Sequence, residues 1–196
     1  MSREQKQSNP EKYFEWYIEE LREAGYVAQW TPQPGTWTIF DKAEYEYVKK
    51  LKTKKKLIKH GIPGLSKMDY TPDYEVVWAQ KAEGVFFQSF EWSFNNDKLT
   101  APFPACPHTT SIIEVKPDFD NRNMTRAVEP KIRMMWQRYG IYVQVIKPNR
   151  LFKETFVPQR YLFCDVLTTR ARKIDYQARS LREYLANPAT KGVNIC

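Results

Sequence analysis

The chain has 196 residues, of which 42% are hydrophobic and 15% aromatic, and its formal net charge is +8. This length indicates one domain with enough apolar material for a core, and the positive charge favours a polyanionic partner. Three cysteines are too few for a disulfide framework, the N-terminus lacks the apolar segment of a signal peptide, and no apolar run is long enough for a membrane span, so an intracellular, cytoplasmic protein is expected.

Residues 8–25 predict the first helix. Ser8 or Asn9 can cap it, Pro10 suits its first turn, and Gly25 is a natural end. The apolar stripe, at spacings of three and four, consists of Phe14, Tyr17, Ile18 and Leu21.

Two short strands are predicted next, over residues 26–30 and 37–40. Residues 41–60 fit either a helix that begins at Asp41 or a strand in which Tyr45 and Tyr47 alternate with other residues. Seven of the eleven residues from 49 to 59 are lysines, a pattern typical of either a solvated segment or an arm that binds phosphates. In the second case the residues expected to contact the phosphates of a nucleic acid are Lys49, Lys50, Lys52, Lys54, Lys55 and Lys56.

Two later stretches place carboxylates where the pattern is typical of buried strands. Asp73 is followed by Tyr74, Val76, Val77 and Trp78, and Glu114 directly follows Ile112-Ile113. A buried carboxylate costs several kcal/mol unless it is neutralised. A divalent cation such as Mg²⁺ can neutralise it, because hard cations prefer oxygen ligands. The side-chain period of two puts Glu114 and Lys116 on one face of a strand, so we expect both to converge with Asp73.

About forty residues separate Asp73 from Glu114, and residues 79–110 are interpreted as an insertion. Residues 85–94 are strand-like. Trp92 and Phe94 are expected either in the core or an interface, or stacked on unpaired bases. A zinc site is not expected, because His60 and His108 are the only histidines and no second ligand pair accompanies Cys106.

The remaining chain predicts a helix over residues 122–139, closed by Gly140, and strands over residues 141–146 and 161–167. A basic helical extension is expected over about residues 168–186, either touching phosphates or packing a second subunit in a homodimer. In the helix before Gly140 the side chains expected to face inward are Ile132, Met135 and Trp136, and those expected to face solvent or DNA include Lys131 and Arg133.

Pro72-Asp73 followed by Glu114-x-Lys116 resembles the signature of the PD-(D/E)XK nuclease superfamily, which includes restriction enzymes, Holliday-junction resolvases and many phage and transposon endonucleases. The resemblance covers roughly residues 8–147. It implies a mixed α/β fold with a restriction-endonuclease-like core, in which helices flank a central mixed sheet. It also implies phosphodiester hydrolysis, in the host cytoplasm if the chain is phage-encoded.

The resemblance further implies roles for individual residues. Asp73 and Glu114 would hold one or two Mg²⁺ or Mn²⁺ ions, with the Val115 carbonyl as a further ligand, and Lys116 would position or deprotonate the attacking water. Relatives often add an acidic ligand from the first helix, so Glu11 and Glu15 are candidates, with Glu11 preferred. A solvated acidic face explains these two glutamates equally well.

Three alternatives stay open from the sequence. Asp73 can simply cap a turn while Glu114 and Lys116 form a surface pair. The chain can be a non-catalytic DNA-binding or assembly module that keeps the nuclease fold. It can also be a nuclease that acts on RNA.

Overall fold

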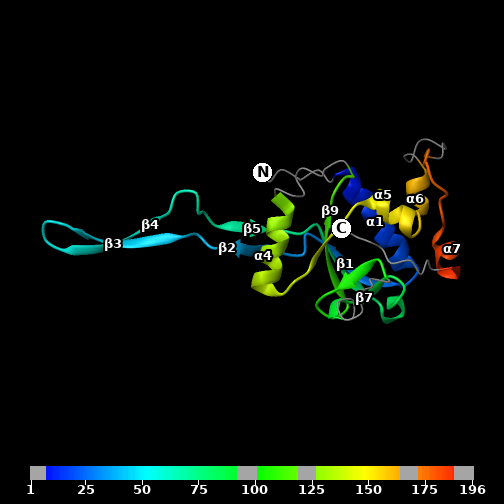
Figure 1. Ribbon diagram of the computed structural model, residues 1–196, viewed down its shortest axis with the longest axis horizontal. Coiled ribbons are helices and arrows are strands. Elements are labelled where there is room, and N and C mark those ends of the chain that lie inside the picture. The colour runs from blue at the N-terminus through cyan, green and yellow to red at the C-terminus, as the bar shows by residue number, and fades with distance from the viewer. Residues whose placement is uncertain (1–7, 92–100, 119–126, 164–171, 188–196) are drawn as a thin grey trace.

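The computed structural model describes residues 8–91, 101–118, 127–163 and 172–187. It has a sheet with helices on both faces and a long two-stranded arm that projects from this body (Figure 1). The helices are α1 (Asn9–Glu23), α4 (Glu129–Tyr139), α5 (Pro148–Glu154), α6 (Gln159–Leu162) and α7 (Leu181–Ala186), with a 3-10 turn η1 (Gln80–Ala82). The strands are β1 (Val27–Pro32), β2 (Trp37–Phe40), β3 (Glu44–Lys50), β4 (Lys55–Gly61), β5 (Met68–Tyr70), β6 (Tyr74–Trp78), β7 (Phe87–Ser89), β8 (Phe103–Ala105), β9 (Thr110–Val115) and β10 (Val143–Ile146).

The four-stranded sheet has the order β1-β6-β9-β10. β6 is antiparallel to both β1 and β9, whereas β9 and β10 are parallel, so the sheet is mixed as expected. Tyr74 pairs with Ile113, and Val115 pairs with Ile146. The start of β6 and the ends of β9 and β10 therefore lie at one edge of the sheet.

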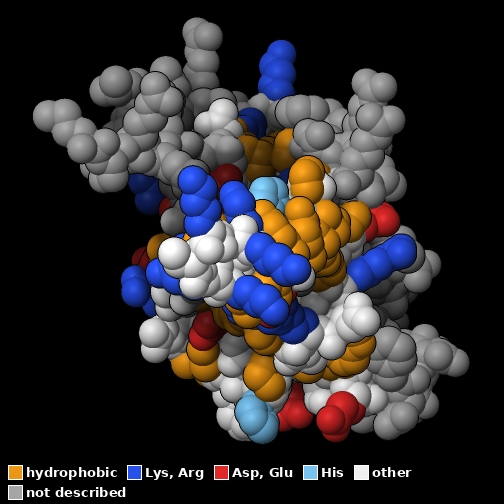
Figure 2. Space-filling view, turned by 90° about the vertical axis from the view of Figure 1, so that its left-hand side faces the viewer, with side chains coloured by type: hydrophobic (Ala, Val, Ile, Leu, Met, Phe, Trp, Pro, Cys, Tyr) orange, Lys and Arg blue, Asp and Glu red, His pale blue; other side chains and the backbone are white. Residues whose placement is uncertain are grey.

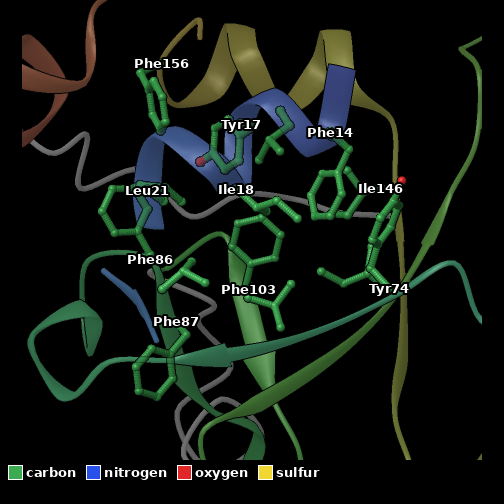
Figure 3. Packing of buried hydrophobic residues seen from close by; sticks show 14 of the residues in the cluster. Phe14, Tyr17, Ile18, Leu21, Tyr74, Phe86, Phe87, Phe103, Ile146 and Phe156 are labelled. Carbon is green, nitrogen blue, oxygen red and sulfur yellow. The ribbon is translucent and has the colours of Figure 1, made fainter. Parts of the chain in front are cut away.

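Helix α1 covers one face of this sheet. Ser8 caps it by accepting a hydrogen bond from the Glu11 backbone N–H, and Gly25 follows its end at a φ of 76°. The predicted stripe of α1 is fully buried and points at the sheet (Figure 3). It packs among β6 and β9 side chains and among aromatic side chains from other elements, including Phe86, Phe103 and Phe156. The prediction of this stripe is confirmed, because apolar residues at spacings of three and four lie on one face of a helix and that face is buried.

A second, smaller core lies on the other face, under α4. Met135 of α4 is fully buried and belongs to a cluster with Ile112 and Val143 of the sheet and Tyr70 of β5. Trp136 was expected inward but is 47% exposed, because its ring packs against Phe90 at 5.2 Å between centroids rather than under the helix.

The described part of residues 79–110, which the sequence analysis interprets as an insertion, contributes to the main core. Phe86 and Phe103 are fully buried, and β7 pairs with β8 in a small parallel sheet. The strand expected over residues 85–94 is only three residues long, with helical backbone at Phe90 and Glu91. The expectations for Trp92 and Phe94 lie outside the described residues.

The ambiguous region 41–60 forms most of a hairpin, not a helix. β3 and β4 are antiparallel from Glu44↔Gly61 to Lys50↔Lys55. β2 and β5 pair with each other between this hairpin and the body, as Figure 1 shows. Of the two alternatives for this region, the strand is correct. Tyr45 and Tyr47 follow the strand period of two and point to the same face.

The C-terminal predictions are wrong in part. The strand expected over residues 161–167 begins inside helix α6, and residues 164–171 lie outside the description. Residues 172–180 are not helical, and α7 starts only at Leu181, where Ser180 and Glu183 form a capping box. Arg172 instead lies over the rings of Tyr13 and Tyr161, which fixes this segment against the body. No described helix is both long and apolar enough to cross a membrane.

Candidate functional site

The candidate site lies at the sheet edge where β6 begins and β9 ends. Asp73 directly precedes β6, and its Oδ2 accepts a 2.7 Å hydrogen bond from the backbone N–H of Val115, the last residue of β9. The antiparallel register makes this contact possible, because Tyr74 pairs with Ile113 just inside the edge. Asp73 is therefore held beside the segment that carries Glu114 and Lys116.

Glu114 is buried, with 7% of its surface exposed, and each carboxylate oxygen has a partner. Lys116 Nζ lies 2.6 Å from Oε1, and the Tyr70 hydroxyl donates to Oε2 at 2.7 Å. Glu114 and Lys116 share a face across the end of the strand, as the period of two predicts. A surface cross-strand pair does not describe this arrangement, because both partners are largely buried.

The ionisable side chains of the site are largely buried and lie close together, and both conditions shift pKa values. Burial, together with the negative charge of Glu114, raises the pKa of Asp73 to about 6. Burial alone would lower the pKa of Lys116, but its hydrogen bond and ion pair with Glu114 outweigh this and raise it. Burial and the neighbouring Glu114 also raise the pKa of Tyr70, so its hydroxyl stays protonated and donates. The arrangement offers two adjacent carboxylates and a protonated amine.

The two glutamates of α1 have different surroundings. The Glu15 carboxylate accepts a 3.2 Å hydrogen bond from the Tyr74 hydroxyl, which also lies 3.3 Å from the Glu11 carbonyl. The charge of Glu11, by contrast, acts on both Asp73 and Lys116. Glu11 makes the smallest of the contributions that raise the pKa of Asp73 and of Lys116, and its carboxylate accepts a hydrogen bond from the Ser8 hydroxyl.

The oxygen donors of the site are two carboxylates, those of Asp73 and Glu114. Among the described residues, no group of three or more His, Cys, Asp or Glu side chains gathers to hold a metal ion. The repulsion between Asp73 and Glu114 is nevertheless the kind that a hard cation relieves, and carboxylate oxygens suit Mg²⁺, which usually keeps several waters and takes only one or two carboxylates. Asp73 and Glu114 are the two carboxylates of this site that would hold such an ion.

The expected DNA-contacting residues fall into two places. The lysines at 49, 50, 52, 54, 55 and 56 are exposed on the arm. Lys131 of α4 lies close to the site instead, with its Nζ 5.8 Å from the Tyr70 ring centroid. Arg133 is exposed, and its guanidinium nitrogen Nη2 lies 3.7 Å from Oε2 of Glu129 on the same helix.

Tyr70 is the site residue that the sequence reasoning missed. It lies three residues before Asp73 at the end of β5 and is buried despite exposed neighbours in that strand. The only signal available was its place in the Tyr-Thr-Pro-Asp-Tyr stretch, and an aromatic there is more often simply core.

Comparison with family models, with curated proteins and with solved structures finds no match for this chain.

Proposed function

We propose that the chain is a metal-dependent endonuclease that hydrolyses DNA phosphodiester bonds with a restriction-endonuclease-like core. The observation that carries the proposal is the convergence of Asp73, Glu114 and Lys116 at one sheet edge. A catalytic site for phosphodiester hydrolysis needs oxygen ligands for a cation and a positive group for the developing phosphate charge, and these three side chains supply both.

In the proposed mechanism, Asp73 and Glu114 would hold Mg²⁺ or Mn²⁺, with the Val115 carbonyl as a further ligand. Such an ion would supply Lewis acidity toward the attacking water and the scissile phosphate. Lys116 keeps its proton next to Glu114, so its role is to hydrogen-bond the attacking water and stabilise the phosphate oxygens. Tyr70 fixes the orientation of the Glu114 carboxylate, a role typical of groups behind a metal ligand.

A non-catalytic DNA-binding module is the second candidate, and one observation favours it. Both Glu114 oxygens already have protein partners, so the Lys116 ion pair can serve as a structural replacement for a cation. In that case the buried pair stabilises the sheet edge and no water is activated. Metal-dependent cleavage separates the two functions.

The test is a panel of end-labelled substrates incubated with Mg²⁺ or Mn²⁺, with EDTA as the control. The panel contains a four-way junction, a flap, single strands, plain duplex and an RNA strand of matched sequence. The proposal predicts metal-dependent internal cuts in at least one DNA substrate. Cleavage of RNA alone would change the substrate class, and binding without cleavage of any substrate would favour the non-catalytic module.

A further inference from the structure

The arm formed by β3 and β4 has two chemically different faces. Directly paired residues of an antiparallel ribbon share a side. On one face Tyr45 lies opposite His60 and Tyr47 lies opposite Ile58. On the other face lie the pairs Glu46↔Lys59 and Val48↔Leu57.

The first face carries a row of exposed rings. The Tyr45 and Tyr47 rings stack at 5.9 Å between centroids, and the His60 ring lies 5.5 Å from that of Tyr45. Tyr45 is 49% exposed and Tyr47 41%. The other face has no such row among the arm's described side chains, and Glu46 and Lys59 neutralise each other there at 2.9 Å. Rings held in a row on a ribbon form a stacking platform.

Positive charge gathers at the tip beside this platform. Lys49 lies opposite Lys56 on the same face as the rings, and Lys50 lies opposite Lys55 on the other face. Like charges placed directly opposite each other destabilise a ribbon, so the tip keeps a repulsion that a polyanion would relieve. Figure 2, which views the molecule from the arm side, shows Lys and Arg side chains grouped next to hydrophobic ones. The lysines at the tip suit the phosphate of a nucleotide, and the planar rings along one face suit its base.

The base of the arm is held against helix α4 and, through β5, against the candidate site. The Tyr139 hydroxyl of α4 donates to the Thr38 carbonyl at 2.7 Å, and Arg138 pairs with Asp41 at 2.7 Å. The returning strand β5 ends at Tyr70, which contacts Glu114. At roughly 3.4 Å per residue, the seven residues of β3 alone extend about 24 Å. The tip therefore reaches nucleotides well away from the candidate site.

We propose that the Tyr45-Tyr47-His60 face stacks on unpaired bases of DNA while the tip lysines bind the flanking phosphates. The inference rests on the proposed function, because it takes DNA as the substrate, and it narrows that substrate to DNA with a single-stranded portion. Stacking on an aromatic ring is worth about 1–3 kcal/mol per base and tolerates any sequence. Bases in a continuous duplex present no free face to such a platform.

A second copy of this chain is a weaker occupant for the same face. Residues 44–61 hold seven lysines against two glutamates, so two arms would repel each other. A nucleic acid is the partner whose charge complements the arm.

The experiment measures binding in EDTA, with Glu114→Gln in every protein so that no DNA is cut. The test variant is Tyr45→Ala/Tyr47→Ala, and its matched control is Val48→Ala/Leu57→Ala, which removes exposed apolar side chains from the opposite face. The probes are a labelled 20-nucleotide single strand, the same sequence as a duplex, and a gapped duplex with 2-aminopurine in the gap. Sedimentation reports the oligomeric state of each protein.

The inference predicts that the tyrosine variant loses at least about 10-fold in affinity for the single strand and the gapped duplex and changes little on intact duplex. It also predicts that 2-aminopurine fluorescence in the gap does not change when the tyrosine variant binds. The fluorescence change should persist with Tyr45→Phe/Tyr47→Phe, because this variant retains both rings. An equal loss on all probes, an equal loss in the control variant, or conversion of a dimer to a monomer would overturn it. Selective tyrosine-dependent binding, together with no cleavage of any DNA by the protein with its native Glu114 in Mg²⁺, would support this inference while refuting the proposed hydrolysis.

Discussion

The Tyr70 hydroxyl donates a 2.7 Å hydrogen bond to Oε2 of Glu114, and this contact joins the base of the arm to the candidate site. Tyr70 ends β5, which pairs with β2 at the arm base, whereas Glu114 lies in the central sheet. The same residue therefore anchors the arm and orients a carboxylate.

Replacing Tyr70 by Phe removes this hydrogen bond but keeps the ring in its core. We expect the Mg²⁺ concentration for half-maximal cleavage to rise about 10-fold or more, because groups behind a metal ligand typically affect affinity by that much. The measurement is a Mg²⁺ titration of the cleavage rate. Tyr139→Phe is the control, since it also removes a hydroxyl near the arm base, at the Thr38 carbonyl. Equal titrations for Tyr70→Phe and the wild type would remove Tyr70 from the site.

Asp73→Asn should stabilise the metal-free protein at neutral pH. The pKa of Asp73 is about 6 in the folded chain, against ~3.9 in an unfolded one. Between these values the folded protein holds a proton that the unfolded chain has lost, so the contribution of this group to stability falls as the pH rises. The neutral amide avoids that loss.

Thermal unfolding in EDTA from pH 4 to 8 tests this prediction. The Tm of Asp73→Asn should exceed that of the wild type most above pH 6, and the difference should shrink toward pH 4. Adding Mg²⁺ should raise the Tm of the wild type more than that of the variant. A variant less stable than the wild type at pH 7.5 in EDTA would contradict the electrostatic account of the site.

Local sequence patterns predicted the parts of the fold that depend on local spacing. The stripe of α1 follows the helical period, and Glu114 and Lys116 follow the strand period. Long-range packing decided the rest. The burial of Phe86 and Phe103 within the supposed insertion, and the exposure of Trp136, depend on which surfaces meet in space. Residues 172–180 are predicted to be helical but are not. Arg172 in this segment packs over Tyr13 and Tyr161, and local sequence patterns cannot predict contacts with such distant residues.

Glu11→Gln and Glu15→Gln separate the roles of the two glutamates of α1. The field of Glu11 reaches Asp73 and Lys116, whereas the Glu15 carboxylate is hydrogen-bonded to Tyr74. We expect Glu11→Gln to raise the Mg²⁺ requirement several-fold and Glu15→Gln to leave it near the wild-type value. A Mg²⁺ titration of both variants measures this. If Glu15→Gln had the larger effect, the assignment would be reversed, and if neither had an effect, α1 would serve only for packing.

The tip lysines should supply affinity that does not depend on sequence. Replacing Lys54, Lys55 and Lys56 by Ala should reduce the slope of log K against log salt concentration by about one unit for each phosphate that the arm no longer neutralises. Binding of a labelled duplex at several salt concentrations measures the slope. Lys12→Ala/Lys153→Ala, on two helices of the body, is the control. An unchanged slope in the tip variant would make these lysines ordinary solvated surface.

Metal-dependent cleavage by matched variants tests the central claim most directly. Wild type, Asp73→Asn, Glu114→Gln and Lys116→Met are each incubated with the DNA panel in Mg²⁺, and binding of the same DNA is measured in parallel in EDTA. We predict that the wild type cuts DNA and that each variant loses at least about 100-fold in rate while binding DNA within a few-fold of the wild type. Near-normal cleavage by any properly folded variant, or no cleavage by the wild type with any substrate, would contradict the account.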